Sequence, residues 1–185
     1  LNNLYSYLLV SLTSILVVIA HPTIIKQDID WPQFMSQQDM IWEKLPEYWY
    51  DSAFLGNGKL GLMIYKEPGE NYIRLETGNC DVHDHRAKRD IFGIPRLLTG
   101  HFALRPKGEI ISGQMRLDLW NAEASTDITT TKGVIHLKTI VHADDMIIVV
   151  KATTEGDEND FKWEWIAAEA NSPRYLIFKR RGQTN

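Results

Sequence analysis

One short stretch of the sequence holds five ionisable side chains: Asp81, His83, Asp84, His85 and Arg86. The two histidines alternate, so on an extended segment they point the same way, as two metal ligands must. The two aspartates could complete a metal site, or act as acid and base in an inverting hydrolysis, which needs carboxylates about 6.5–9.5 Å apart. A third possibility is structural, because loop Asp and His side chains often bond backbone groups or pair with an arginine.

A second candidate group is aromatic and lies before this stretch. It consists of Trp31, Trp42, Tyr48, Trp49 and Tyr50. Flat aromatic faces suit the C–H face of a sugar ring, which would make the group a carbohydrate-stacking platform. Large aromatic side chains more often anchor an incoming segment to a core, because each buries so much area. We therefore favour the anchoring interpretation.

The elements that position the ionisable stretch are predicted to be two strands joined by turns. Gly56, Asn57 and Gly58 form a cluster that tolerates positive φ and therefore indicates a tight turn. A strand is expected over Leu60–Tyr65, a turn at Pro68-Gly69, and a second strand over Tyr72–Glu76 that ends in the ionisable loop. Functional side chains are often presented at the rim of a sheet in this way.

The rest of the chain predicts a meander of short strands and little helix. A short helix is expected within Gln33–Trp42, and the strands are expected at His101–Arg105, Gln114–Trp120, Ala124–Thr131, Val134–His142, Met146–Ala152, Phe161–Ala167 and Tyr175–Phe178. The nearly continuous apolar run at Met146–Ala152 predicts burial on both faces. The alternation of Trp163 and Trp165 predicts core positions. Short strands linked by Gly, Asp and Asn turns indicate an all-β fold, an antiparallel β-sandwich.

Composition and charge exclude several classes of function. The chain has 185 residues, enough for one sizeable core, and its net charge of -4 gives no electrostatic argument for nucleic-acid binding. Cys80 is the single cysteine, which excludes an intrachain disulfide. No thiol-activating motif surrounds it, so a catalytic role is not expected.

The N-terminal region predicts export. Leu8–Ala20 is apolar and uncharged, and it is short for a membrane span, which takes about 20 residues. Val18 and Ala20 fit the small-residue rule for cleavage before His21, which indicates a signal peptide; a buried helix is the alternative. We therefore expect a signal peptide at residues 1–20, a lead-in at 21–50 and a domain at 51–185, in a secreted or periplasmic protein without a membrane span.

The segments DSAFLGNGKLG (residues 51–61) and IRLETGNCDVHDHR (residues 73–86) resemble the start of the N-terminal domain of glycoside hydrolases related to family 95, the inverting α-L-fucosidase type. Family 65 enzymes carry a similar domain. The resemblance implies a supersandwich of the galactose-mutarotase-like kind that precedes an (α/α)6 barrel with the catalytic carboxylates. The residues after Arg105 are all assigned to strands, so we expect no barrel within this sequence.

The resemblance therefore implies a non-catalytic N-terminal domain or fragment of a secreted glycoside hydrolase. Its partner would be carbohydrate, reached through the catalytic domain, and neither a cofactor, a metal nor a nucleic acid is expected. Substrate or interdomain contacts are assigned to Asp81, His83, Asp84, His85, Arg86 and Trp49. The alternative is a free-standing carbohydrate-binding β-sandwich module, which the aromatic group and the single-domain length favour.

Overall fold

The computed structural model describes residues 28–85, 95–169 and 171–182. The chain divides into two units, Leu1–Asp30 and Trp31–Asn185, and every described helix and strand belongs to the second. The predicted signal peptide at residues 1–20 lies outside the described residues. Within the described ranges, no helix is both long enough and apolar enough to cross a membrane.

Most elements follow one another with short connections, but β4 and β5 are separated by residues 80–99. In chain order they are α2 (Trp31–Ser36), β1 (Met40–Trp42), the 3-10 helix η1 (Trp49–Asp51), β2 (Ala53–Gly56), β3 (Leu60–Lys66), β4 (Ile73–Asn79), β5 (Gly100–Arg105), β6 (Ile110–Asp118), β7 (Glu123–Thr130), β8 (Gly133–Val141), β9 (Ile148–Gly156), β10 (Lys162–Ala167) and α3 (Pro173–Arg180).

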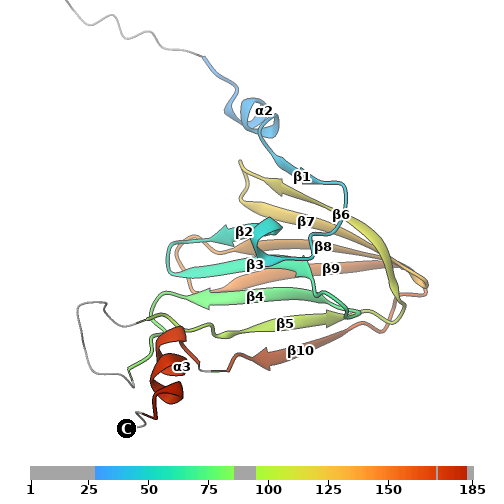
Figure 1. Cartoon of the computed structure of the whole chain (residues 1–185). Helices are drawn as coiled ribbons and strands as arrows, with labels where there is room; N and C mark the ends of the chain where they lie inside the picture. Colours follow the sequence, from blue (N-terminus) through green and yellow to red (C-terminus); the bar gives the residue numbers. More distant parts are fainter. Residues whose placement is uncertain (1–27, 86–94, 170, 183–185) are drawn as a thin grey trace, which may run out of the picture. The chain divides into compact units, whose positions relative to one another are not determined.

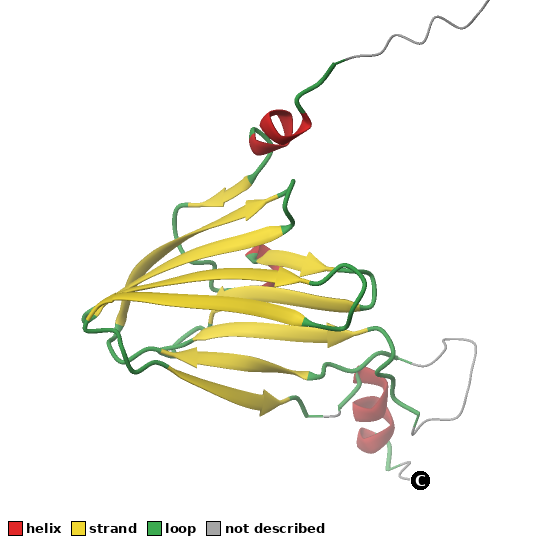
Figure 2. Ribbon diagram, turned by 180° about the vertical axis from the view of Figure 1, so that it is seen from behind, coloured by secondary structure: helices red, strands yellow, loops and turns green. Residues whose placement is uncertain are grey.

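The strands form two five-stranded sheets, which Figures 1 and 2 show from opposite sides. Sheet A has the order β1-β6-β7-β8-β9, and sheet B has the order β10-β5-β4-β3-β2. Every neighbouring pair is antiparallel. The described chain is therefore mostly β and consists of two facing antiparallel sheets, as the spacing of turns and strands predicts.

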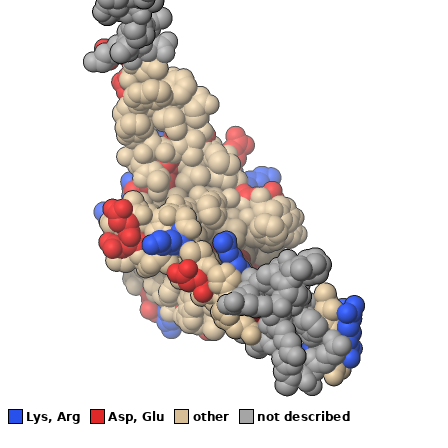
Figure 3. Space-filling model, turned by 90° about the vertical axis from the view of Figure 1, so that its left-hand side faces the viewer, with Lys and Arg blue, Asp and Glu red and all other residues tan. Residues whose placement is uncertain are grey.

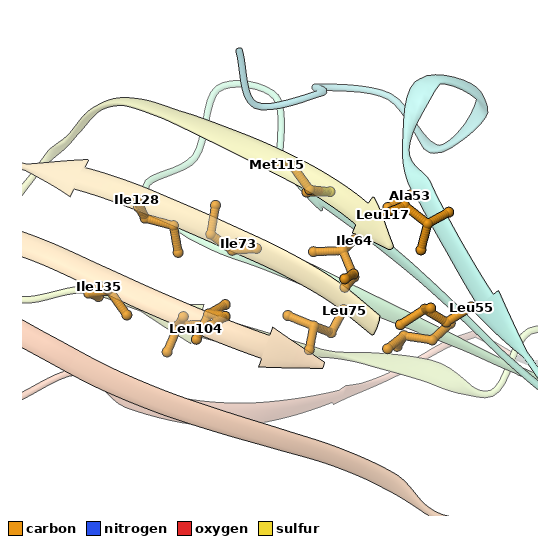
Figure 4. Close-up of a cluster of buried hydrophobic side chains, with 13 residues drawn as sticks. Ala53, Leu55, Ile64, Ile73, Leu75, Leu104, Met115, Leu117, Ile128 and Ile135 are labelled. Carbon is orange, nitrogen blue, oxygen red and sulfur yellow. The ribbon is translucent and has the colours of Figure 1, made fainter. Parts of the chain in front are cut away.

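The core lies between the sheets and is built from alternate residues of the inner strands. Sheet B contributes Leu62 and Ile64 from β3, whereas sheet A contributes Ile128 from β7 and Ile135 from β8, all at most 1% exposed. Figure 4 shows side chains from both sheets pointing into this layer. Each buried residue of this size stabilises the fold by about 1.5–3 kcal/mol relative to exposure to water. The predicted alternation of β8 is confirmed, because Ile135, Leu137 and Thr139 are buried on one face.

Both predicted terminal elements need correction. Tyr175–Phe178 lies within helix α3 instead of a strand. The sequence Ser172-Pro173 at its start is typical of a helix N-terminus, because proline at the first helical position loses no hydrogen bond. The predicted helix within Gln33–Trp42 is also wrong in extent: α2 ends at Ser36, and Met40–Trp42 pairs with β6 as strand β1.

The prediction that Met146–Ala152 is buried on both faces is wrong. Strand β9 begins at Ile148 and lies at the edge of sheet A, where Val149 is 46% exposed. An edge strand has a neighbour on one side only, and here only its alternate residues Ile148, Val150 and Ala152 pack against the core.

The prediction of core positions for Trp163 and Trp165 is also wrong, although both side chains face inward. Trp163 pairs with Leu104, a core residue, and Trp165 pairs with Phe102. Opposite residues of an antiparallel pair lie on the same face, so both tryptophans lie on the core side of sheet B. They are nevertheless 41% and 46% exposed. Leu104 of β5 is fully buried in the core shared by the two sheets, whereas Phe102 and both tryptophans of the β5–β10 edge stay partly open to solvent.

Candidate functional site

The ionisable loop follows β4 and is fastened to two other parts of the chain. The amide of Asp84 donates to the Pro95 carbonyl at 2.8 Å, and the amide of Leu97 donates to the Val82 carbonyl at 3.0 Å. The Asp84 side chain is 3% exposed, and its Oδ2 accepts a hydrogen bond from Ser172 Oγ at 2.6 Å. Asp84 therefore ties the loop to the segment that begins α3.

The other predicted residues of this loop are more open. Asp81 and His85 are exposed, and the rings of His83 and His85 lie 6.3 Å apart in an edge-to-face arrangement. Arg86 lies outside the described residues. The structure therefore brings His83 and His85 together, while it buries Asp84 in a structural hydrogen bond.

Neither of the two chemical roles considered for this loop receives support from its geometry. Among the residues that the structure describes, no group of three or more His, Cys, Asp or Glu side chains could hold a metal ion. Asp84 is too buried to meet a substrate, whereas a catalytic acid must lie within hydrogen-bonding reach of the group that it protonates. The geometry shows a structural role for Asp84, through its hydrogen bond with Ser172.

The aromatic group is mostly exposed. Tyr48 and Tyr50 stack with their ring centroids 5.2 Å apart, and Trp49 meets Tyr50 edge-to-face at 5.6 Å. Trp49 is 60% exposed. Trp42 alone behaves as an anchor, because it packs against the core and its Nε1 donates to the Asp51 carbonyl at 2.7 Å. The anchoring interpretation is therefore confirmed for Trp42 and wrong for the other four aromatics, which are about half exposed or more: Trp31, Tyr48, Trp49 and Tyr50.

Sequence reasoning missed a cleft on the outer face of sheet B. It has a volume of about 330 Å³ and lies between the β2–β3 turn, the end of β4 and the Arg96–Leu98 segment. Gly61 and Gly78 are cross-strand partners in β3 and β4, so the sheet carries no side chain at this point. Glycines inside strands are the available signal, because they often mark a place where a ligand or another backbone approaches closely.

An aromatic ring forms one wall of this cleft. Phe54 of β2 is 61% exposed, and a Cβ atom added to Gly61 would lie 3.3 Å from its ring. A Cβ atom added to Gly56 would also lie 3.3 Å from the ring. The ring therefore lies against two bare stretches of backbone and keeps a face open to solvent.

Two cations line the same cleft. Lys59 comes from the β2–β3 turn, where Asn57 Oδ1 accepts hydrogen bonds from the amides of Lys59 and Leu60 at 3.0 and 2.8 Å. Arg96 comes from the segment before β5. Within the described ranges neither forms an ion pair. Figure 3, which looks at this end of the molecule, shows basic side chains beside acidic ones on a mostly uncharged surface.

Cys80 also lines the cleft. Its Sγ donates to Asp81 Oδ1 at 3.4 Å. Desolvation raises the pKa of the Cys80 thiol, and the hydrogen bond and negative charge of Asp81 raise it further, while Arg96 and Lys59 act in the opposite direction. A thiol with a raised pKa is a poor nucleophile at neutral pH, so the surroundings of Cys80 do not activate it.

A buried polar cluster covers the neighbouring part of sheet B. Tyr65 donates from its hydroxyl to Glu76 Oε2 at 2.5 Å, and Arg74 lies 3.4 Å from the same carboxylate. Burial, followed by the hydrogen bond to Glu76, raises the pKa of Tyr65. His101 stacks on Tyr72 with ring centroids 6.0 Å apart. Arg74 also donates from Nη1 to Glu67 Oε2 at 3.0 Å, while its buried Nε has no hydrogen-bond partner among the described residues. The paired hydroxyl and carboxylate of Tyr65 and Glu76 therefore stabilise this part of the sheet.

The comparisons with known proteins give no match: neither a protein-family model nor a curated protein matches this chain.

Proposed function

We propose that the chain is the non-catalytic N-terminal β-sandwich domain of a secreted glycoside hydrolase of the α-L-fucosidase type. In this proposal the sandwich is of the galactose-mutarotase-like supersandwich kind and supports an (α/α)6 barrel that carries the catalytic carboxylates. Residues 1–20 serve as the signal peptide and direct the protein to the periplasm or the extracellular space. The resemblance of residues 51–61 and 73–86 to such domains motivates the proposal.

The observation that carries the proposal is an aromatic ridge on the core side of sheet B. The ridge consists of Phe102, Trp163 and Trp165, which are 39%, 41% and 46% exposed. Phe102 and Trp165 lie with ring centroids 4.7 Å apart. Contiguous apolar side chains at a surface usually mark an interaction site, and these three lie on the face that a sandwich normally buries. A further packed layer over the β5–β10 edge would account for them.

The ionisable loop has a supporting role in this proposal. Asp84 holds the loop to the start of α3 through Ser172, while Asp81, His83 and His85 remain accessible or partly accessible. Together with Arg86 they would make polar contacts to the neighbouring domain, and the catalytic acid and base would come from that domain. Interfaces of this kind within a chain are more polar than obligate ones.

Reading the genomic DNA beyond the codon for Asn185 tests the proposal directly. We expect a large helical domain in the same reading frame. The purified 185-residue chain should release no aglycone from aryl α-L-fucosides or aryl galactosides. Aglycone release that disappears in Asp84→Asn, or the absence of any following helical domain, would contradict the proposal.

A second candidate function is a free-standing carbohydrate-binding module, and the exposed aromatic side chains of Tyr48, Trp49 and Tyr50 favour it. Trp49 is 60% exposed beside the stacked pair Tyr48 and Tyr50, which offers flat faces to a sugar ring. Calorimetric titration with plant oligosaccharides distinguishes the two functions. Saturable binding that is abolished in Trp49→Ala and preserved in Trp120→Ala supports the module. Trp120 is a suitable control because it is 50% exposed but lies in the turn between β6 and β7.

A further inference from the structure

We propose that the cleft on the outer face of sheet B binds an anionic sugar residue, one that carries a carboxylate or a sulfate. The cleft is lined by Phe54, Lys59, Gly61, Gly78, Cys80 and Arg96, together with neighbouring backbone. The inference rests on the proposed function in one respect, which is that a glycan is the class of ligand. The inference adds where on the domain the glycan binds and that the glycan carries a negative charge.

The floor of the cleft is bare backbone. Gly61 and Gly78 lie opposite each other, and a Cβ atom added to Gly78 would meet no atom within 4 Å. The space above Gly78 is therefore open, and a ring can approach the strands more closely than any side chain would allow. The volume of about 330 Å³ suits a small ligand.

The wall favours a ligand with an apolar face. The ring of Phe54 lies against Gly56 and Gly61 and leaves its other side in solvent. A pyranose has such a face in its axial C–H groups, whereas a free inorganic anion has none. The Phe54 ring would thus contribute stacking area to a sugar and nothing to a bare phosphate or sulfate ion.

The charges favour an anion. Lys59 and Arg96 both line the cleft, and both act electrostatically on the Cys80 thiol, which lines it too. Asp81 supplies a carboxylate beside this thiol, whose hydrogen bond it accepts at 3.4 Å. Two cations thus outnumber one carboxylate here. A carboxylate or sulfate would receive charge-assisted hydrogen bonds from them, and the guanidinium can bind it through two parallel bonds.

Titration calorimetry on the full chain tests the inference with three probes. Trigalacturonic acid carries carboxylates, its methyl ester is the matched neutral ligand, and a sulfated galactotriose supplies the other anion. The double variant Lys59→Met/Arg96→Met removes the charge, and Gly78→Leu fills the cleft at a position where added atoms meet nothing. Lys151→Met is the control, because Lys151 is an exposed cation on β9 of the other sheet.

We expect trigalacturonic acid or the sulfated probe to bind, and whichever binds identifies the anionic group. Affinity should fall by at least about tenfold in Gly78→Leu and in the double variant, and stay unchanged in Lys151→Met. Equal binding of the acid and its methyl ester would overturn the inference, as would full affinity in the double variant or no binding of either anion. The proposed function is judged separately, by the genomic reading, so its failure can be told from a failure of this site.

Discussion

Asn57 in the β2–β3 turn donates from Nδ2 to the main-chain carbonyl of His142, 2.8 Å away in the β8–β9 loop of the other sheet. The same amide reaches the Asp145 carbonyl at 3.0 Å. Its Oδ1 accepts two amides of its own turn. One side chain therefore shapes the turn that carries Lys59 and also joins sheet B to sheet A.

We expect Asn57→Ala to lower the free energy of unfolding by about 1–3 kcal/mol, because main-chain groups in both loops lose their partner. Asn57→Asp should be intermediate, since it keeps the acceptor and loses the donor. Urea unfolding monitored by circular dichroism measures both. Asn159→Ala, at an exposed loop position, is the control and should change stability by less than about 0.5 kcal/mol. An unchanged midpoint for Asn57→Ala would show that the sheets do not depend on this link.

Glu158 is a fully buried carboxylate that holds three parts of the fold together. It accepts hydrogen bonds from the amides of Gly108 and Lys107 at 2.5 and 2.9 Å, and from the Thr130 hydroxyl at 2.6 Å. Burial alone would raise the pKa of Glu158, but these hydrogen bonds outweigh it and the pKa is lowered from 4.5. Because the folded pKa is below the unfolded one, this carboxylate stabilises the fold above about pH 4.5 and loses its effect as the pH falls through the folded pKa.

Glu158→Gln should therefore destabilise the chain at neutral pH by about 1–3 kcal/mol and flatten the acid side of the stability profile. The glutamine side chain would bring an NH₂ donor toward the Lys107 and Gly108 amides and the Thr130 hydroxyl, which are themselves donors. Thermal unfolding at a series of pH values measures this, with the exposed Glu109→Gln as the matched control. If the two variants have the same pH profile, Glu158 does not have this role.

His136 and His101 should titrate on opposite sides of the usual histidine pKa of 6.5. The hydrogen bond to Asp127 Oδ1, at 2.7 Å, raises the pKa of His136, whereas burial and then the charge of Arg74 lower the pKa of His101. The His136–Asp127 pair thus favours folding below pH 6.5, and its contribution disappears as the pH rises through the pKa of His136 in the folded chain.

NMR titration of the histidine ring protons measures both values in one experiment. We expect the His136 midpoint to lie above that of His101, and Asp127→Asn to bring the His136 midpoint down without moving His101. A single shared midpoint would contradict the assigned environments.

The aromatic ridge should make the native chain bind the apolar dye ANS. We expect Trp163→Ser/Trp165→Ser to reduce the dye fluorescence while the chain stays folded, because about half of each ring already contacts water. Ile111→Ser removes a single exposed side chain, 64% exposed on β6, and should leave the fluorescence unchanged. If both variants bind the dye as the wild type does, the ridge is not an accessible apolar surface.

The sequence predicts the sheet meander well because its signals are local. Lys132-Gly133 lies at the turn between β7 and β8, and the alternation of Ile135, Leu137 and Thr139 specifies the buried face. The overlap of the two sheets is not a local property. Whether Trp165 is buried depends on which strand of sheet A lies opposite β10, and no pattern within β10 encodes this.

The candidate site was predictable only in part for a similar reason. The turn at Asn57 is evident from its glycines, but the cleft requires that Gly61 and Gly78 be cross-strand partners. That register follows from the pairing of β3 with β4 over their whole length. The role of Asp84 likewise depends on Ser172, a residue distant in sequence that the fold brings within 2.6 Å.

Hydroxyl-radical footprinting of Trp163 and Trp165 tests the central claim most directly. It would compare the 185-residue chain with the longer polypeptide that the gene is proposed to encode. Trp120, which is 50% exposed in the turn between β6 and β7, serves as the internal reference. We predict strong oxidation of both tryptophans in the chain alone and protection in the longer protein, with Trp120 oxidised equally in both. Equal oxidation of Trp163 and Trp165 in the two proteins would contradict the account.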